Sequence, residues 1–272
     1  MLFARKKTPV FILGCQRSGT TICQEVFRRS RDTWVFSEGN RLAMTDGWRL
    51  RPLSDIDELI DRSRKRILIF KPLNDSQRVG EFIDYFPGSR TLWVFRDVLD
   101  TVQSAVRKWG PAQRNMMTYI GDALRASDSP EAALDRMGEW PSCAVYAEKL
   151  SPATYDRIVD WTAQPISDAT GAAILWYARN SLFFDQGLEG HARAMPVRYE
   201  NLVTDPTNQI ARICEFIGVR YSRKLSQEVY SSSVGKGSQY EIDKAVLDAC
   251  QELQLQFERA ESLSNRAEPI VA

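Results

Sequence analysis

Residues 10–21 read VFILGCQRSGTT, and the rest of the chain is interpreted from this stretch. Four apolar residues are followed by Gly14, and after a short polar segment the chain continues as TICQEVFRR at 21–29. An apolar run, a glycine break and a polar entry into a helical pattern are typical of a buried strand, a tight loop and a helix N-terminus. The sequence therefore predicts a strand, a loop and a helix in direct succession.

The loop between this strand and helix has the features of an anion site. Amides of a first helical turn and the positive end of the helix dipole stabilise negative charge. The spacing from Gly14 to Gly19 matches the frame of nucleotide phosphate loops, but Thr20 stands where those loops have lysine. Arg17 supplies a cation three positions earlier. We expect a phosphate-type anion other than the β/γ-phosphates of a nucleoside triphosphate; the alternative is a turn with an incidental arginine.

Composition limits the class of protein. The chain has 272 residues, 43% of them hydrophobic, which suits one α/β domain with insertions over residues 1–272. Lys and Arg number 36 against 35 acidic residues, a net charge of +1, so no global field points to nucleic acid or to a membrane surface. Any anion site must therefore be local. Nothing in the composition indicates an oligomeric state.

Segment lengths and cysteine spacing narrow the class further. The first apolar run is too short for a signal sequence, and no run approaches the roughly 18 residues of a membrane span. We expect a soluble, cytoplasmic protein. Five cysteines, odd in number and without C-x-x-C spacing, argue against a disulfide framework and a zinc site, so no metal is expected. They are Cys15, Cys23, Cys143, Cys214 and Cys250.

Strand-like and helix-like segments alternate along the chain. The apolar run that ends before Ser37 is a strand or a loop edge. Further strands are expected at 67–70, 91–95 and 195–199, and helices at 54–66, 76–85, 100–108, 169–184, 206–217 and around 242–257. This alternation predicts an α/β fold with a mostly parallel sheet and a ligand beyond the carboxyl ends of the strands. Gly14, Lys71 and Arg96 all fall at such ends.

The segment at about 110–165 is interpreted as an irregular, aromatic insertion on the substrate side. Aromatic side chains can stack on a sugar face or a phenol ring. Each one taken singly is more often part of the core than of a binding surface. The aromatic residues are Trp109, Tyr119, Trp140, Tyr146, Tyr155 and Trp161.

Three stretches resemble sulfotransferases that use 3′-phosphoadenosine 5′-phosphosulfate (PAPS). QRSGTT at 16–21 is similar to the family's 5′-phosphosulfate loop in its arginine form, as in bacterial, carbohydrate and protein-tyrosine members. LWVFRDVLDTVQSAVRKWG at 92–110 resembles the 3′-phosphate motif, and PVRYENLVTDPTNQIARICEFIGV at 196–219 resembles a strand-and-helix segment near the C-terminus. The resemblance covers about 9–240 except the insertion. It implies a three-layer, P-loop-like sandwich around a parallel sheet.

The resemblance implies roles for the phosphosulfate loop. Arg17 would contact the sulfonate and the bridging oxygen. The 5′-phosphate would be held by the surrounding residues Gln16, Ser18, Gly19, Thr20 and Thr21.

The resemblance also implies a 3′-phosphate site. Arg96 and Ser104 would bind this doubly charged group, which suits a forked guanidinium and a hydroxyl. Tyr199 would lie by the adenine, and Lys236 in VGKG resembles a basic loop that closes on the 3′-phosphate. The alternatives are that Arg96 and Ser104 are a structural pair and that Tyr199 packs under the strand end.

Glu38 in FSEGNR is similar to the glutamate that some members use as a general base, and Lys71 in IFKPL to a lysine after the following strand. Many cytosolic members use histidine as the base, but the single histidine, His191, lies far from the motifs along the chain and is interpreted as incidental. The alternatives are a surface carboxylate at Glu38 and a solvated lysine at Lys71.

The expected function is transfer of a sulfuryl group from PAPS to a hydroxyl, with Glu38, Arg17 and Lys71 as catalytic residues. The acceptor is expected to be a carbohydrate or another small-molecule alcohol, and an amine acceptor stays open. No metal is required on this mechanism. Two alternatives are a P-loop nucleoside or sugar kinase, against which the missing loop lysine counts, and a non-catalytic nucleotide-binding protein.

Overall fold

Strand β1 (Thr8–Gly14) is the central strand of a five-stranded sheet in the computed structural model, which describes residues 7–139, 141–227, 229, 235, 237 and 239–266. The other strands are β2 (Thr33–Phe36), β3 (Ile67–Phe70), β4 (Arg90–Phe95) and β5 (Ala194–Arg198). Their order is β2-β3-β1-β4-β5, and each pair of neighbours is parallel. The expected α/β class with a parallel sheet is confirmed.

The helices that surround and follow the strands are numbered in chain order. They are α1 (Thr20–Arg28), α2 (Leu53–Arg62), α3 (Val79–Tyr85), α4 (Val98–Trp109), α5 (Ala112–Arg125), α6 (Pro130–Arg136), α7 (Pro141–Ala147), α8 (Pro152–Trp161), α9 (Asp168–Asp185), α10 (Tyr199–Thr204), α11 (Pro206–Ile217) and α12 (Lys244–Arg266). Short 3₁₀ turns are η1 (Leu73–Arg78), η2 (Met137–Glu139) and η3 (Arg223–Leu225).

The chain divides into two compact units. One, here called the sheet unit, comprises Met1–Phe95, Glu189–Ser232 and Ala260–Ala272 and holds all five strands. The other, here called the helical unit, comprises Arg96–Leu188 and Ser233–Arg259. Each is described by itself below. The chain passes from the first unit to the second directly after β4, so Arg96 is the first residue of the helical unit.

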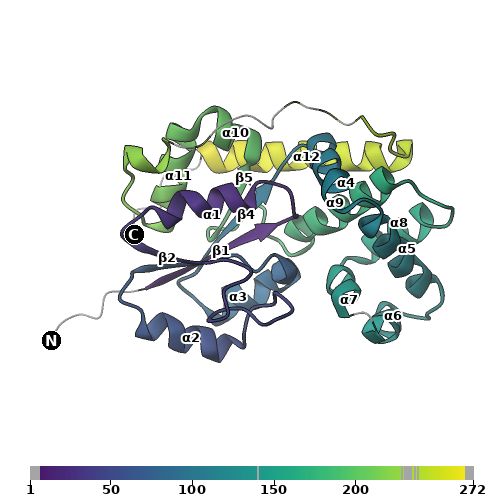
Figure 1. Cartoon of the computed structure of the whole chain (residues 1–272), viewed down its shortest axis with the longest axis horizontal. Helices are drawn as coiled ribbons and strands as arrows, with labels where there is room; N and C mark the ends of the chain where they lie inside the picture. The colour runs from purple at the N-terminus through teal and green to yellow at the C-terminus, as the bar shows by residue number, and fades with distance from the viewer. Residues whose placement is uncertain are drawn as a thin grey trace. The chain divides into compact units, whose positions relative to one another are not determined.

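Both faces of the sheet are covered, as the apolar strands require. Within the sheet unit, α1 and α11 lie over one face and α2 and α3 over the other, which gives three layers (Figure 1). Phe11 stacks on Phe70 and Phe82 with ring centroids 5.7 and 4.6 Å apart. A strand that is buried on both faces has no polar alternation, which is why VFIL reads as a continuous apolar run.

The strand order places the loop after β1 at a switch point. From β1 the chain forms β2 and β3 on one side, and it then crosses to form β4 and β5 on the other. In open parallel sheets, ligands bind beyond the carboxyl ends of the strands where the order reverses in this way. The loop at 14–19 starts at this position.

The prediction of an irregular segment at 110–165 is wrong, because α5, α6, α7 and α8 occupy most of it. Two of these helices begin with a sequence signal that an interpretation based on aromatic residues does not use. Ser129 and Ser151 each cap a helix that has proline at its first position, and their hydroxyls accept bonds from Ala132 N and Thr154 N. A serine cap followed by proline is a strong helix start.

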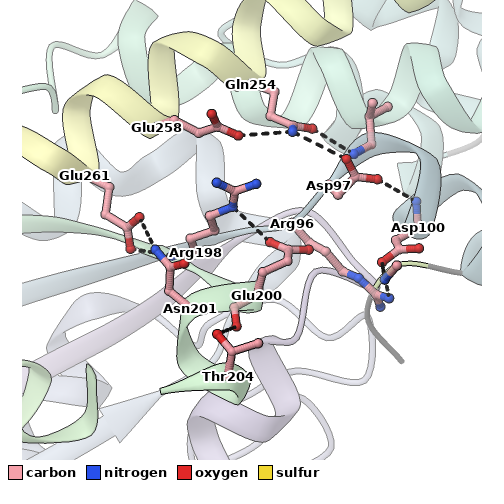
Figure 2. A network of polar contacts seen from close by, with 12 residues as sticks. Arg96, Asp97, Asp100, Arg198, Glu200, Asn201, Thr204, Gln254, Glu258 and Glu261 are labelled. Carbon is pink, nitrogen blue, oxygen red and sulfur yellow. Dashed lines mark hydrogen bonds and ion pairs between the residues drawn. The ribbon is translucent and has the colours of Figure 1, made fainter. Parts of the chain in front are cut away.

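The last expected strand also ends earlier than predicted, since Tyr199 is the first residue of α10 rather than the end of β5. A buried carboxylate explains where the strand stops. Glu261 accepts a bond from Arg198 N at 3.1 Å and one from Asn201 Nδ2 at 2.8 Å (Figure 2). Burial raises the pKa of Glu261, while the bonds and the charge of Arg212 oppose the rise.

Candidate functional site

The loop after β1 has an unusual backbone, and its glycines explain why it can form. Gly14 has φ 127°, and a Cβ there would lie 2.3 Å from Val94 O of the neighbouring strand. Gly19 has φ 89° and is the N-cap of α1. Arg17, between them, adopts φ 67°, a conformation that a non-glycine side chain rarely takes. Backbone strain of this kind concentrates at ligand sites.

Tyr199 fixes the helical end of this loop. A Cβ on Gly19 would lie 2.1 Å from Tyr199 Cδ2, so the tyrosine ring packs directly on the glycine. The Tyr199 side chain is buried, with 2% of the residue exposed. This placement agrees with packing at the strand end. The structure thus brings the third motif of the sequence to the first.

The start of α1 has the polar groups that the sequence predicted. No side chain caps its first turn. Ser18 is fully buried, and its hydroxyl has no hydrogen-bond partner within the part of the chain that the structure describes. Thr20 is 3% exposed, while Arg17 and Thr21 are exposed. A buried polar group without a partner calls for a physical explanation, and an anion at this helix N-terminus is one.

Two residues that hydrogen-bond the loop after β1 were not predicted from the sequence. Ser76 Oγ accepts from Gly14 N at 3.2 Å, and Gln16 Nε2 donates to Asn74 Oδ1 at 3.4 Å. Both partners belong to η1, which follows Lys71. The signal was the polar run Asn74-Asp75-Ser76 a few residues after the end of β3, near the ligand edge of the parallel sheet.

Lys71 joins two of the predicted functional residues. Its Nζ lies 2.9 Å from Glu38 Oε2 and donates to Thr21 Oγ1 at 3.1 Å. The Lys71 side chain is 6% exposed and that of Glu38 is 30% exposed. Glu38 follows β2, Lys71 follows β3 and Thr21 lies in the first turn of α1, so the ends of three elements meet at one ammonium group.

Cys23, in α1, lies close enough to Lys71 for the lysine charge to act on its thiol. The thiol is completely buried, and burial raises its pKa to about 12, although the positive charge of Lys71 acts in the opposite direction. A thiol with this pKa stays protonated at neutral pH, and it behaves as a small apolar side chain rather than as a nucleophile. The charged groups of the cluster are therefore Glu38 and Lys71.

In the helical unit, the Arg96 guanidinium forms an ion pair with the Asp100 carboxylate. The guanidinium NH2 lies 3.3 Å from Asp100 Oδ2, and both side chains are buried (Figure 2). Trp176 Nε1 donates to Arg96 O at 3.1 Å. The same Asp100 carboxylate accepts bonds from Gly235 N and Gly237 N. A structural role for Arg96 therefore involves Asp100, a residue that the sequence analysis did not single out.

The remaining predicted residues have different surroundings. Ser104 is half-buried on α4, four residues after Asp100. Lys236 lies outside the described residues. His191 Nδ1 accepts a bond from Arg193 N at 3.1 Å, which is a local turn contact in the sheet unit.

Among the residues that the structure describes, no group of three or more His, Cys, Asp or Glu side chains is arranged to hold a metal ion. None of the helices in this part of the chain combines the length and the apolar character of a membrane span.

A family model described as "Sulfotransferase family" matches residues 144–223. The match covers less than a third of the chain. The matched segment runs from within α7 to the first residue of η3 and includes Tyr199. It does not include the phosphosulfate-like loop, Glu38, Lys71 or Arg96, so the roles of those residues rest on their own geometry.

Three solved structures are similar to this chain, and the first of them shares its fold. The sulfotransferase domain of the Synechococcus PCC 7002 olefin synthase is 18% identical, with 97% of each chain covered and a TM-score of 0.51. A sulfotransferase from Alicyclobacillus acidocaldarius is 17% identical, covering 97% of this chain and 98% of the other, with a TM-score of 0.44. Mouse sulfotransferase SULT7A1 complexed with PAP is 14% identical, covering 96% and 85%, with a TM-score of 0.43. No curated protein matches the sequence.

The contact of Gly19 with Tyr199 gives a prediction about the stability of the fold. Gly19→Ala adds a strained φ and a clash with the tyrosine ring, whereas Gly218→Ala adds only a strained φ, since nothing lies within 4 Å of its Cβ. We expect Gly19→Ala to lower the free energy of unfolding by about 1–3 kcal/mol more than Gly218→Ala. Chemical denaturation of both variants measures the difference, and equal losses would contradict the packing argument.

Proposed function

We propose that this protein is a sulfotransferase that moves the sulfuryl group of PAPS to a hydroxyl of a carbohydrate or another small-molecule alcohol, leaving adenosine 3′,5′-bisphosphate. The observation that carries the proposal is the cluster of Lys71, Glu38 and Thr21 beside the loop after β1. A cation, a carboxylate and a helix N-terminus within one cluster are the groups that in-line transfer between oxygens requires.

The 5′ end of the donor is assigned to the loop. The first-turn amides of α1 and the buried Ser18 hydroxyl supply donors for a phosphate, as does the exposed Thr21 hydroxyl. Arg17 is exposed at the strained position of the loop, and we assign it to the sulfonate and the bridging oxygen. Gln16, Gly19 and Thr20 complete the loop and hold its shape.

The chemical step needs one proton acceptor and positive charge near the leaving oxygen. We assign Glu38 as the base that takes the proton of the acceptor hydroxyl while that oxygen forms a bond to sulfur. The bond between sulfur and the bridging oxygen breaks, and Arg17 and Lys71 stabilise the negative charge that develops on the leaving phosphate.

Lys71 also holds the base. Its ammonium group bonds one carboxylate oxygen of Glu38 at 2.9 Å and is itself buried, so it fixes the position of the carboxylate. Glu38 is the more exposed partner, as a group that must meet an incoming acceptor has to be. Preorganisation of this kind is worth more at a reaction centre than a surface ion pair is for stability.

The 3′-phosphate is assigned to Arg96 and Ser104, with Lys236 as a further contact and Tyr199 beside the nucleotide. Arg96 carries a buried guanidinium, a group whose fork matches a phosphate. Ser104 lies two helical turns along α4 from the strand end. Tyr199, buried against Gly19, would act on the nucleotide through the loop that it supports.

Ligand binding tests the donor class. Adenosine 3′,5′-bisphosphate should raise the thermal midpoint of the purified protein, because a ligand at a hundred times its Kd adds about 2.7 kcal/mol to stability. ATP with Mg²⁺ is the comparison ligand. A rise with ATP and Mg²⁺ alone would replace the proposal with a P-loop kinase, and a rise with the bisphosphate identifies the donor.

Glu38→Gln tests the base. The variant should bind adenosine 3′,5′-bisphosphate as the wild type does but lose about 10²- to 10⁴-fold in transfer rate, because glutamine cannot take the proton. Glu25→Gln, on the exposed side of α1 where Glu25 pairs with Arg28, is the matched control and should leave transfer unchanged. Unimpaired transfer in Glu38→Gln would remove Glu38 from this role.

Arg96→Lys tests the 3′-phosphate contact. Lysine keeps the charge but not the fork, so binding of adenosine 3′,5′-bisphosphate should weaken about tenfold while binding of adenosine 5′-monophosphate should stay the same. The exposed Arg107 on α4 provides the control substitution Arg107→Lys. Titration calorimetry measures each Kd, and equal losses for both nucleotides would contradict the assignment.

A further inference from the structure

The Asp100 carboxylate receives three donors inside the helical unit. Gly235 N donates to Oδ2 at 3.0 Å, Gly237 N donates to Oδ1 at 2.9 Å, and Arg96 NH2 lies 3.3 Å from Oδ2 (Figure 2). Both carboxylate oxygens are therefore engaged. The two glycines are about 135 residues away along the chain, so this is a tertiary contact rather than a local cap.

The two amides form a donor set of the kind that binds anions. Gly235 has φ 70° and Gly237 has φ 59°, left-handed conformations that glycine adopts readily. Backbone amides in such segments create concave anion sites. Together with a guanidinium, they would suit a carboxylate or a phosphate equally well. Here a carboxylate of the chain itself occupies the set.

Burial makes this arrangement rigid. The side chain of Asp100 is 3% exposed and that of Arg96 is 8% exposed. A buried charge that loses its partner is strongly destabilised, so each of the two holds the other in place. Asp100 is thereby the residue that fixes both the guanidinium of Arg96 and the glycine segment.

Asp100 and Ser104 both lie on α4. Asp100 lies four residues after Arg96 and four residues before Ser104, so Asp100 and Ser104 share one face of the helix. Side-chain hydrogen bonds also fix the N-terminal end of α4. Asp97 caps it by accepting from Asp100 N at 2.9 Å, and Gln254 Nε2 donates to Asp97 at 3.4 Å. Glu258 accepts from the same Gln254 amide at 3.2 Å.

We propose that Asp100 is a positioning residue for recognition of the donor's 3′-phosphate: it holds the Arg96 guanidinium in the arrangement that meets this group, and it anchors Gly235 and Gly237 beside that guanidinium. The inference rests on the proposed function, which assigns Arg96 to the 3′-phosphate. Asp100 acts through Arg96 and the glycine segment and does not itself contact the nucleotide. Fixing these groups before binding reduces the ordering that the ligand must otherwise impose.

Asp100→Asn is the decisive variant. Asparagine is nearly isosteric, but it lacks the negative charge and turns one acceptor into a donor that faces another donor. Asp97→Asn is the matched control, because it removes the same charge from the same helix end while asparagine remains a good N-cap. Titration calorimetry with adenosine 3′,5′-bisphosphate and with adenosine 5′-monophosphate gives the Kd values for each protein.

We expect Asp100→Asn to weaken the bisphosphate by about tenfold or more and to change the monophosphate by less than about twofold, with Asp97→Asn near the wild type for both ligands. Equal weakening of both ligands would reduce Asp100 to a general structural residue and overturn the proposal. Tighter binding of the bisphosphate would also overturn it, because Asp100 would then be a competitor of the phosphate.

Amide hydrogen exchange at Gly235 and Gly237 without nucleotide separates this proposal from the proposed function. Exchange should be faster in Asp100→Asn than in the wild type and in Asp97→Asn, and unchanged exchange would overturn the holding role. If the wild type binds no bisphosphate while exchange responds as expected, the proposed donor fails and the contact of Asp100 with the glycines stands. Should Asp100→Asn not fold, Asp100→Glu, which keeps the charge but displaces the carboxylate, should show the same ligand-selective loss.

Discussion

Strand β1 can be central only because its last residue has no side chain. Gly14 pairs with Val94 of β4 so closely that a Cβ would lie 2.3 Å from the Val94 carbonyl oxygen. Its φ of 127° also turns the chain away from the strand and into the loop. The sheet register, the switch point and the loop that opens towards the ligand edge therefore all depend on one close backbone approach, and Ser76 secures it by bonding Gly14 N.

The arrangement of the strands also determines what Lys71 contacts. β3 pairs with β1, so Lys71, the residue after β3, lies next to the first turn of α1. β2 pairs with β3, so Glu38, two positions after β2, lies next to Lys71. The result is an ammonium group in contact with Thr21 and Glu38. Parallel topology, rather than any feature of the individual side chains, brings these three residues together. The same logic explains why polar residues of η1 support the loop.

The central strands were predictable because burial on both faces leaves an unbroken apolar run, as in the four residues Ile67–Phe70. Helices α6 and α8 were missed because attention to aromatic residues obscured the Ser-Pro starts at Ser129 and Ser151. Tyr199 was assigned to a strand because it follows the mostly apolar segment at 195–198, yet the bond from Arg198 N to Glu261 ends the ladder there. A partner 63 residues away leaves no local trace.

The sequence by itself determined the α/β class, the parallel sheet and the loop at 14–21, because these depend on local periodicity and on the backbone freedom of two glycines. It also indicated that Glu38, Lys71 and Arg96 follow strand ends. Only the tertiary structure decided what each of them contacts. The packing of Tyr199 on Gly19 and the bonds from Gly235 and Gly237 to Asp100 join residues far apart in the chain. Such pairings depend on how strands and helices pack, and no spacing within a single segment specifies them.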